Sequence, residues 1–210
     1  MSFKNVFENF YKNNFGNVFL SPPVFHKFPV GLRFEIGNKN ADNEQKYIEN
    51  AKSRALSIFN ELFGENEKLY LVVDSYEKYR DFYDEEPVDN VSIIKDLVSK
   101  IDNEYCYEKL VQKYDNDEGE YPYSRYVIET TVNFIDAEKL ISKIVESELK
   151  NNSALANSLF FINKNSGILY FLYDDRGLDV VAKDEKNLKD IYIKFNDWVL
   201  DSDIQKTETI

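Results

Sequence analysis

The sequence predicts an α+β fold in which an antiparallel or mixed sheet carries helices packed mainly on one face. Short apolar runs bounded by turn residues indicate strands, and amphipathic stretches between them have the spacing of helices with one buried side. The C-terminal part combines both patterns in one unit. The chain has 210 residues, of which 43% are hydrophobic and 15% aromatic, so it can bury a sizeable core, and we expect a single domain over residues 1–210.

The C-terminal unit is the most strongly specified part of the chain. Two apolar runs, residues 159–163 and 168–173, flank the hairpin turn signal Lys164-Asn165-Ser166-Gly167. A third run at residues 178–182 completes a predicted three-stranded antiparallel meander. Residues 185–200 then predict an amphipathic helix, because apolar residues recur at the spacing of one helical face: Leu188, Ile191, Tyr192, Phe195, Trp198 and Val199.

The remaining elements follow from the same patterns. We expect helices at residues 2–15, 42–63, 91–101 and 137–150, and strands at residues 30–36, 68–74, 105–114 and 123–132. Asp42 with Gln45 resembles a capping box, and Asp136 and Asp184 stand where N-caps are expected. Pro22-Pro23 begins a loop. The sequence leaves open whether the strands at residues 30–36 and 68–74 pair with each other.

The chain is strongly acidic, with 38 Asp and Glu against 26 Lys and Arg and a net charge of −12. Such a surface repels phosphate backbones and attracts basic proteins, so we expect no nucleic acid and a basic protein as partner. No apolar stretch has the length of a membrane span, and the N-terminus lacks a secretory signal. We therefore expect a cytoplasmic protein without membrane association.

The densest group of charges at an ordered position lies in the turn after the second meander strand. Asp174, Asp175, Arg176 and Asp179 form a carboxylate set beside an arginine, which could bind a cation or perform acid–base chemistry. The alternative is turn chemistry: Asp bonds to the nearby backbone, Gly177 supplies a positive φ, and the arginine pairs with a carboxylate. Both interpretations stay open.

Arg33 and Glu35 share one face of their predicted strand. They could form an ion pair over a solvated sheet face or line a pocket. His26, the only histidine, lies in a loop with apolar neighbours and without a recognisable nucleophile motif, and Cys106 is most simply a small apolar residue. We expect no catalytic residue, no cofactor and no metal from these positions.

Residues 74–89 are acidic and rich in tyrosine. Tyrosine is frequent at binding hot spots, and dense carboxylates steer basic partners. The segment could therefore dock a basic protein, or it could be an ordinary surface loop of an acidic chain. The candidate partner-binding residues are Tyr76, Tyr79, Tyr83, Asp84, Glu85 and Glu86. Residues 115–120 suggest a calcium loop by composition, but Gly119 stands at the fifth position and Tyr126 at the twelfth, which argues against it.

The sequence Tyr173-Asp174-Asp175-Arg176-Gly177-Leu178-Asp179-Val180, followed by Ile191-Tyr192 and Trp198, resembles an uncharacterised family of Bacillus-type bacteria with a C-terminal Y-D-D-R-G motif. The resemblance covers about residues 157–205, and it is looser at residues 31–37 and 54–63. It implies bacterial origin and marks the turn residues as family features, without implying a reaction. The very acidic region of residues 74–121 departs from the pattern.

Two main hypotheses of function follow. The first is a non-enzymatic acidic protein-binding module, for example an immunity protein that neutralises a basic toxin. The second is an enzyme, or a metal- or ligand-binding site, built on Asp174, Asp175 and Arg176, which requires these carboxylates to converge in a pocket. A third alternative is a ligand-binding or structural module whose acidity serves solubility. The sequence does not indicate an oligomeric state.

Overall fold

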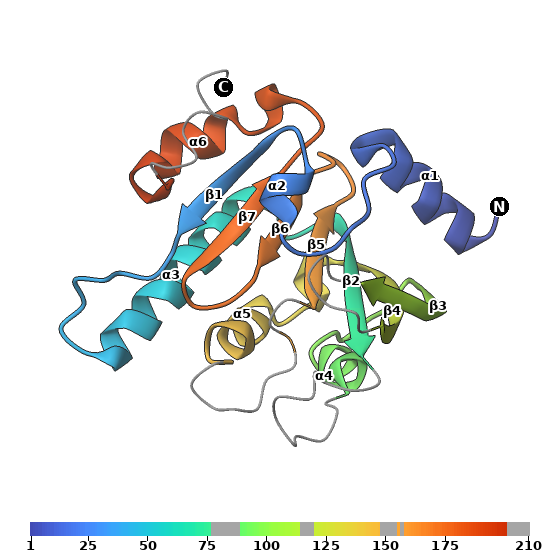
Figure 1. Cartoon of the computed structure of the whole chain (residues 1–210), viewed down its shortest axis with the longest axis horizontal. Coiled ribbons are helices and arrows are strands. Elements are labelled where there is room, and N and C mark those ends of the chain that lie inside the picture. The colour runs from blue at the N-terminus through green and yellow to red at the C-terminus, as the bar shows by residue number, and fades with distance from the viewer. Residues whose placement is uncertain (77–88, 114–119, 148–154, 156–157, 201–210) are drawn as a thin grey trace.

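The computed structural model describes residues 1–76, 89–113, 120–147, 155 and 158–200. In this part of the chain seven strands form one antiparallel sheet in the order β1-β7-β6-β5-β2-β4-β3 (Figure 1). The α+β prediction is confirmed. The strands are β1 (Gly31–Glu35), β2 (Lys68–Tyr76), β3 (Asn103–Lys113), β4 (Glu120–Thr131), β5 (Leu159–Asn163), β6 (Leu169–Leu172) and β7 (Gly177–Val181).

Helices cover both faces of the sheet, with most of them on one. The helices are α1 (Phe3–Phe15), α2 (Val24–Lys27), α3 (Glu44–Leu62), α4 (Asn90–Asp96), α5 (Ala137–Val145) and α6 (Lys189–Phe195). The larger core cluster joins the sheet to α3, α4, α5 and α6, and the smaller one joins its other face to α1 and α2. Figure 1 shows α2 in front of the strands and α3 behind them. No helix in the described residues is both long and apolar enough to cross a membrane.

Burial on both faces explains the continuous apolar runs of the central strands. Every residue of β5, β6 and β7 is buried. In β2 the side chains alternate, with Leu69 and Leu71 in the larger cluster and Tyr70 and Val72 in the smaller. A strand that is covered on both sides favours apolar residues on both of its faces, and polar residues there, such as Asn163 and Asp179, need hydrogen-bond partners. The pattern is therefore a consequence of the three-layer arrangement.

The C-terminal meander is present as predicted. β5 pairs with β6, and β6 with β7, with Phe161 opposite Tyr170 and Tyr170 opposite Val180. The first turn is closed by Asn163, whose Oδ1 accepts the backbone N–H groups of Asn165 (2.8 Å) and Ser166 (3.2 Å). Gly167 adopts a φ of +67° in this turn, which glycine reaches at little cost.

The continuous helix expected at residues 185–200 is wrong. A 3₁₀ turn (Glu185–Asn187), α6 and a second 3₁₀ turn (Asn196–Trp198) replace it, and Asp184 makes no side-chain cap. The chain leaves the helix because it pairs with the outer edge of β1: Val199 bridges Phe34, and the Leu200 N–H donates to the Arg33 carbonyl (3.1 Å). Asn and Asp have low helix propensities, so these tertiary backbone hydrogen bonds decide the local conformation.

Several other boundaries differ from the predictions. The helix expected to reach residue 101 ends at Asp96, because the Ser99 N–H donates to the Phe134 carbonyl (2.7 Å) and the Asp136 N–H to the Leu97 carbonyl (2.9 Å). α5 ends at Val145, and residues 148–150 lie outside the described chain. Asn43 caps α3 in place of Asp42, and Asp136 caps α5 as predicted.

The strands β1 and β2 do not pair. β7, β6 and β5 stand between them. α3 therefore connects two strands across the sheet, and β1 reaches the turn that precedes β7. This long connection places Arg33 opposite Asp179, and it brings α3 close to the same turn.

Candidate functional site

The charged turn lies between β6 and β7 and is held by its own side chains. Asp174, which is 2% exposed, accepts the Arg176 backbone N–H (2.8 Å) on Oδ1 and the Arg176 Nε–H (2.8 Å) on Oδ2. Arg176 Nη2 forms an ion pair with the same carboxylate. The Arg176 carbonyl in turn accepts the N–H of Ile36 at the end of β1 (3.0 Å). The pair closes the turn and ties it to the neighbouring strand.

Arg33 and Asp179 form the second ion pair of this region. They stand opposite each other in the β1–β7 register, so the strand pairing brings them together. Arg33 Nε lies 2.8 Å from Asp179 Oδ1 and Nη2 lies 3.2 Å from Oδ2. Asp179 is 1% exposed and also accepts the Phe25 backbone N–H (2.9 Å), while the Arg33 guanidinium lies over the Phe25 ring. The carboxylate therefore fixes α2 onto the sheet.

Asp175 is the carboxylate of the turn with the least complete bonding. It is half-buried, and its Oδ1 has no hydrogen-bond partner in the described residues. Burial and the nearby Asp174 carboxylate raise its pKa. The Tyr47 hydroxyl of α3 donates to the Asp175 carbonyl (3.4 Å). Burial and the Asp175 carboxylate raise the pKa of Tyr47 to about 12.

Gly177 is required for space rather than for a positive φ. The glycines in the described residues with a positive φ are Gly16 and Gly167, so the expected backbone conformation of Gly177 is wrong. A Cβ at Gly177 would lie 2.1 Å from the Tyr173 hydroxyl and 2.8 Å from the Phe34 carbonyl oxygen. The glycine lets β1 and the tyrosine approach the turn closely.

Glu35 stands apart from Arg33. It pairs with Lys39 (2.5 Å), and Arg33 pairs with Asp179, so the two residues belong to different ion pairs. Within the described residues no three His, Cys, Asp or Glu side chains gather closely enough to hold a metal ion. Four of the sequence-predicted residues thus come together as two ion pairs that join β1, the turn and α2, and Asp175 has a buried oxygen without a hydrogen-bond partner in the described residues.

The tyrosine-rich segment is described only at its ends. Tyr76 ends β2, and its ring stacks on Tyr123 of β4 with 5.3 Å between centroids. Asp89 caps α4 by accepting the N–H groups of Val91 and Ser92. The other candidate residues lie outside the described chain: Tyr79, Tyr83, Asp84, Glu85 and Glu86. Most of the calcium-like loop, residues 114–119, lies outside it too.

A buried ion pair joins the middle of the sheet to the N-terminal segment. Arg125 of β4 donates from Nε and Nη2 to Asp74 of β2 (both 2.7 Å) and from Nη2 to the Leu20 carbonyl (2.6 Å). Asp74 stands opposite Arg125 in the register. This pair was not predictable from the sequence, because Asp74 and Arg125 come together only through the pairing of β2 with β4.

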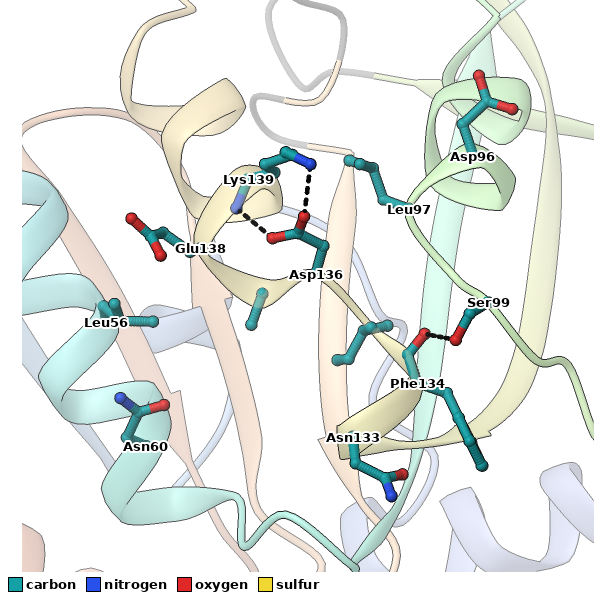
Figure 2. A pocket seen from close by; sticks show the side chains of 12 residues that line it. Leu56, Asn60, Asp96, Leu97, Ser99, Asn133, Phe134, Asp136, Glu138 and Lys139 are labelled. Atoms are coloured by element: carbon teal, nitrogen blue, oxygen red, sulfur yellow. Dashed lines mark hydrogen bonds and ion pairs between the residues drawn. The ribbon is translucent and has the colours of Figure 1, made fainter.

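A groove opens on the side of the sheet that carries the larger core cluster, between α3, α4 and the start of α5 (Figure 2). Its volume is about 610 Å³, within the range of ligand-binding pockets. Leu56 and Asn60 of α3 form one wall, and Asp96 and Leu97 the other. The bonds that end α4 early, between residues 97–99 and 134–136, also shape the floor of this groove.

Acidic side chains rim the groove. Asp96 and Glu138 are exposed, and neither makes an ion pair with a described residue. Asp136 accepts the Lys139 N–H (3.1 Å) and pairs with Lys139 Nζ (2.8 Å), and these bonds lower its pKa. The groove was not identified from the sequence, since its lining comes from three separate segments and carries no motif.

Two other residues considered from the sequence are placed individually. His26 is exposed in α2, and its Nε2 lies 3.3 Å from Arg33 Nη1, beside the Arg33–Asp179 pair. Cys106 is half-buried in β3, opposite Tyr126 of β4. Neither has a catalytic partner arrangement in the described residues.

Comparison with known proteins places the chain among bacterial proteins. Residues 7–203 match the family described as "Domain of unknown function (DUF3885)". The chain is also similar to the "Uncharacterized protein YnaE" of Bacillus subtilis (strain 168), with 23% identity over 205 residues that cover 90% of this chain and 94% of that protein. No solved structure matches the chain significantly.

Proposed function

We propose that this chain, which belongs to the DUF3885 family of domains of unknown function, is a non-enzymatic module that binds a basic protein through its acidic surface. The observation that carries the proposal is the excess of acidic residues, 38 − 26 = 12. An internal ion pair uses one base for every acid, so such pairs leave the excess unchanged. A carboxylate without an internal base is stable in water or against the bases of a partner, and it attracts basic proteins over long range.

The chemistry of the turn supports binding over catalysis. Asp174 and Asp179 are each bonded to a guanidinium and to a backbone N–H. A carboxylate held in this way is a poor general base, because the guanidinium stabilises its charged form, and most of its acceptor sites are already occupied. The alternative of an enzyme or a metal- or ligand-binding site at Asp174, Asp175 and Arg176 is therefore the less supported of the two.

A finer form of the proposal is an immunity protein in the cytoplasm that neutralises a basic toxin. Enzymes that act on nucleic acids carry positive grooves for phosphate. An acidic protein surface of complementary shape blocks such a groove by replacing the phosphates. The net charge of −12 on a chain of this size suits that role.

The experiment is capture of partners from lysate of the native bacterium by the immobilised protein, followed by identification and titration of each purified candidate. We expect a stoichiometric basic protein whose dissociation constant rises with salt, because screening weakens exposed charge pairs. Failure to reconstitute any complex from purified proteins, or a complex with an acidic partner and no salt dependence, contradicts the proposal.

A further inference from the structure

We propose that the groove between α3, α4 and α5 is the docking site for a basic segment of a partner protein that carries large apolar anchor residues. This inference rests on the proposed function and deepens it, because it assigns the contact to one surface. The segment would place its apolar side chains on the floor and its Lys or Arg residues against the rim.

The walls and floor of the groove supply apolar surface. Leu56, Leu97, Ile135 and Ala137 line it and are only partly buried, although each packs against the larger core cluster. The half-buried Phe134 completes the lining, and Lys100 lies over its ring. Burying such surface under an apolar side chain is favourable in proportion to the area covered. These side chains come from α3, from the start of α5 and from the segments that follow α4 and precede α5, so the apolar lining is formed before a partner arrives.

The rim decides the charge of the occupant. Asp96, Asp136 and Glu138 line the groove together with one base, Lys139, which already pairs with Asp136. The other base nearby in the described residues, Lys100 over the Phe134 ring, pairs with Asp102. A helix start often attracts anions, but here the Asp136 carboxylate occupies the first turn of α5 by accepting the Lys139 N–H. The excess of acids along the rim disfavours phosphate and carboxylate ligands and is complementary to ammonium and guanidinium groups.

The probe is a synthetic peptide of about a dozen residues, in which two Leu three positions apart are flanked by Lys. A control peptide has both Leu replaced by Ser and keeps every charge. Binding is measured by fluorescence anisotropy, and the contact surface is mapped by amide chemical shifts. We expect shifts centred on Leu56, Leu97 and Ala137, and at least about tenfold weaker binding of the control peptide.

Two protein variants with the same change in net charge locate the contact. Asp96→Lys with Glu138→Lys reverses the rim, whereas Glu108→Lys with Asp184→Lys reverses two exposed acids that do not line the groove. All four positions are on the surface, so both variants should fold, which circular dichroism checks. We expect the rim variant to lose at least about tenfold in affinity and the control to change less than about threefold.

Equal losses in the two variants, or shifts spread over the whole acidic surface, overturn the inference that the groove is the contact. Equal binding of the two peptides also overturns it, because the apolar floor would then contribute nothing. These outcomes leave the proposed function standing, since a basic partner could bind elsewhere on the surface. The proposed function fails separately, when no basic protein forms a salt-dependent complex.

Discussion

Asp179→Asn tests whether the ion pair beside the charged turn stabilises the fold. The carboxylate is 1% exposed and accepts three hydrogen bonds, from Arg33 Nε (2.8 Å), Arg33 Nη2 (3.2 Å) and the Phe25 N–H (2.9 Å). Asparagine keeps one acceptor oxygen and presents an NH₂ group to donors on the other side. Losing a charged hydrogen bond costs about 1.5–3 kcal/mol, and leaving a buried charge without its partner costs about 3–5 kcal/mol. Arg33 keeps some solvent contact, with 17% of its side chain exposed, so we expect a loss of about 3 kcal/mol.

The assay is urea denaturation of the purified protein, followed by circular dichroism. The matched control is Glu35→Gln, which makes the same acid-to-amide change on β1 at an exposed pair with Lys39 and should cost less than about 1 kcal/mol. The double variant Arg33→Met with Asp179→Leu should be less destabilised than the sum of its single variants. A loss below about 1 kcal/mol for Asp179→Asn, or strict additivity in the cycle, refutes the structural role.

Three further predictions concern the same region. Gly177→Ala should cost about 1–3 kcal/mol of stability in urea denaturation, because the new Cβ would lie 2.8 Å from the Phe34 carbonyl oxygen. The control Gly64→Ala, whose Cβ would have no contact closer than 3.4 Å, should cost less. Equal losses in the two variants would contradict the close packing at Gly177. Trp198→Ala should cost about 2–3 kcal/mol, less than for a fully buried Trp, because its ring is only partly buried; a loss below about 1 kcal/mol would detach it from the core. Burial raises the pKa of Asp175 above its ordinary 3.8, so the charged carboxylate lowers the stability of the folded protein at a pH above 3.8. Asp175→Asn should therefore raise Tm at neutral pH. This gain should disappear as the pH falls through the raised pKa toward 3.8. A gain that stays constant with pH would assign the effect to another cause.

Local signals were sufficient for the C-terminal meander. The meander was predictable because its apolar runs and its Asn-Ser-Gly turn specify strands and a hairpin without reference to the rest of the chain. The end of the last helix was not predictable from local signals, since Val199 and Leu200 pair with β1, a strand more than 150 residues earlier in the sequence. A single sequence does not contain that contact.

The residues of the candidate site were predictable from the sequence, but most of the ion pairs and hydrogen bonds between them were not. Asp174 with Arg176 is a local pair that turn chemistry suggests. The pairing of Arg33 with Asp179 required the β1–β7 register, and the closeness of Tyr47 to Asp175 required the position of α3. The groove was not predictable at all, because its walls belong to segments brought together only by the tertiary bonds that end α4.

The most direct test of the account is the dissociation constant of the purified basic partner for the wild-type protein and for Asp175→Asn, at about 50 and about 300 mM salt. Asp175 carries the oxygen in the turn without a hydrogen-bond partner in the described residues, and its substitution breaks neither guanidinium pair. Binding through the acidic surface predicts equal dissociation constants for the two proteins and at least about tenfold weaker binding of both at the higher salt. A constant that is raised about tenfold in the variant and is insensitive to salt would place recognition at the turn and contradict the account.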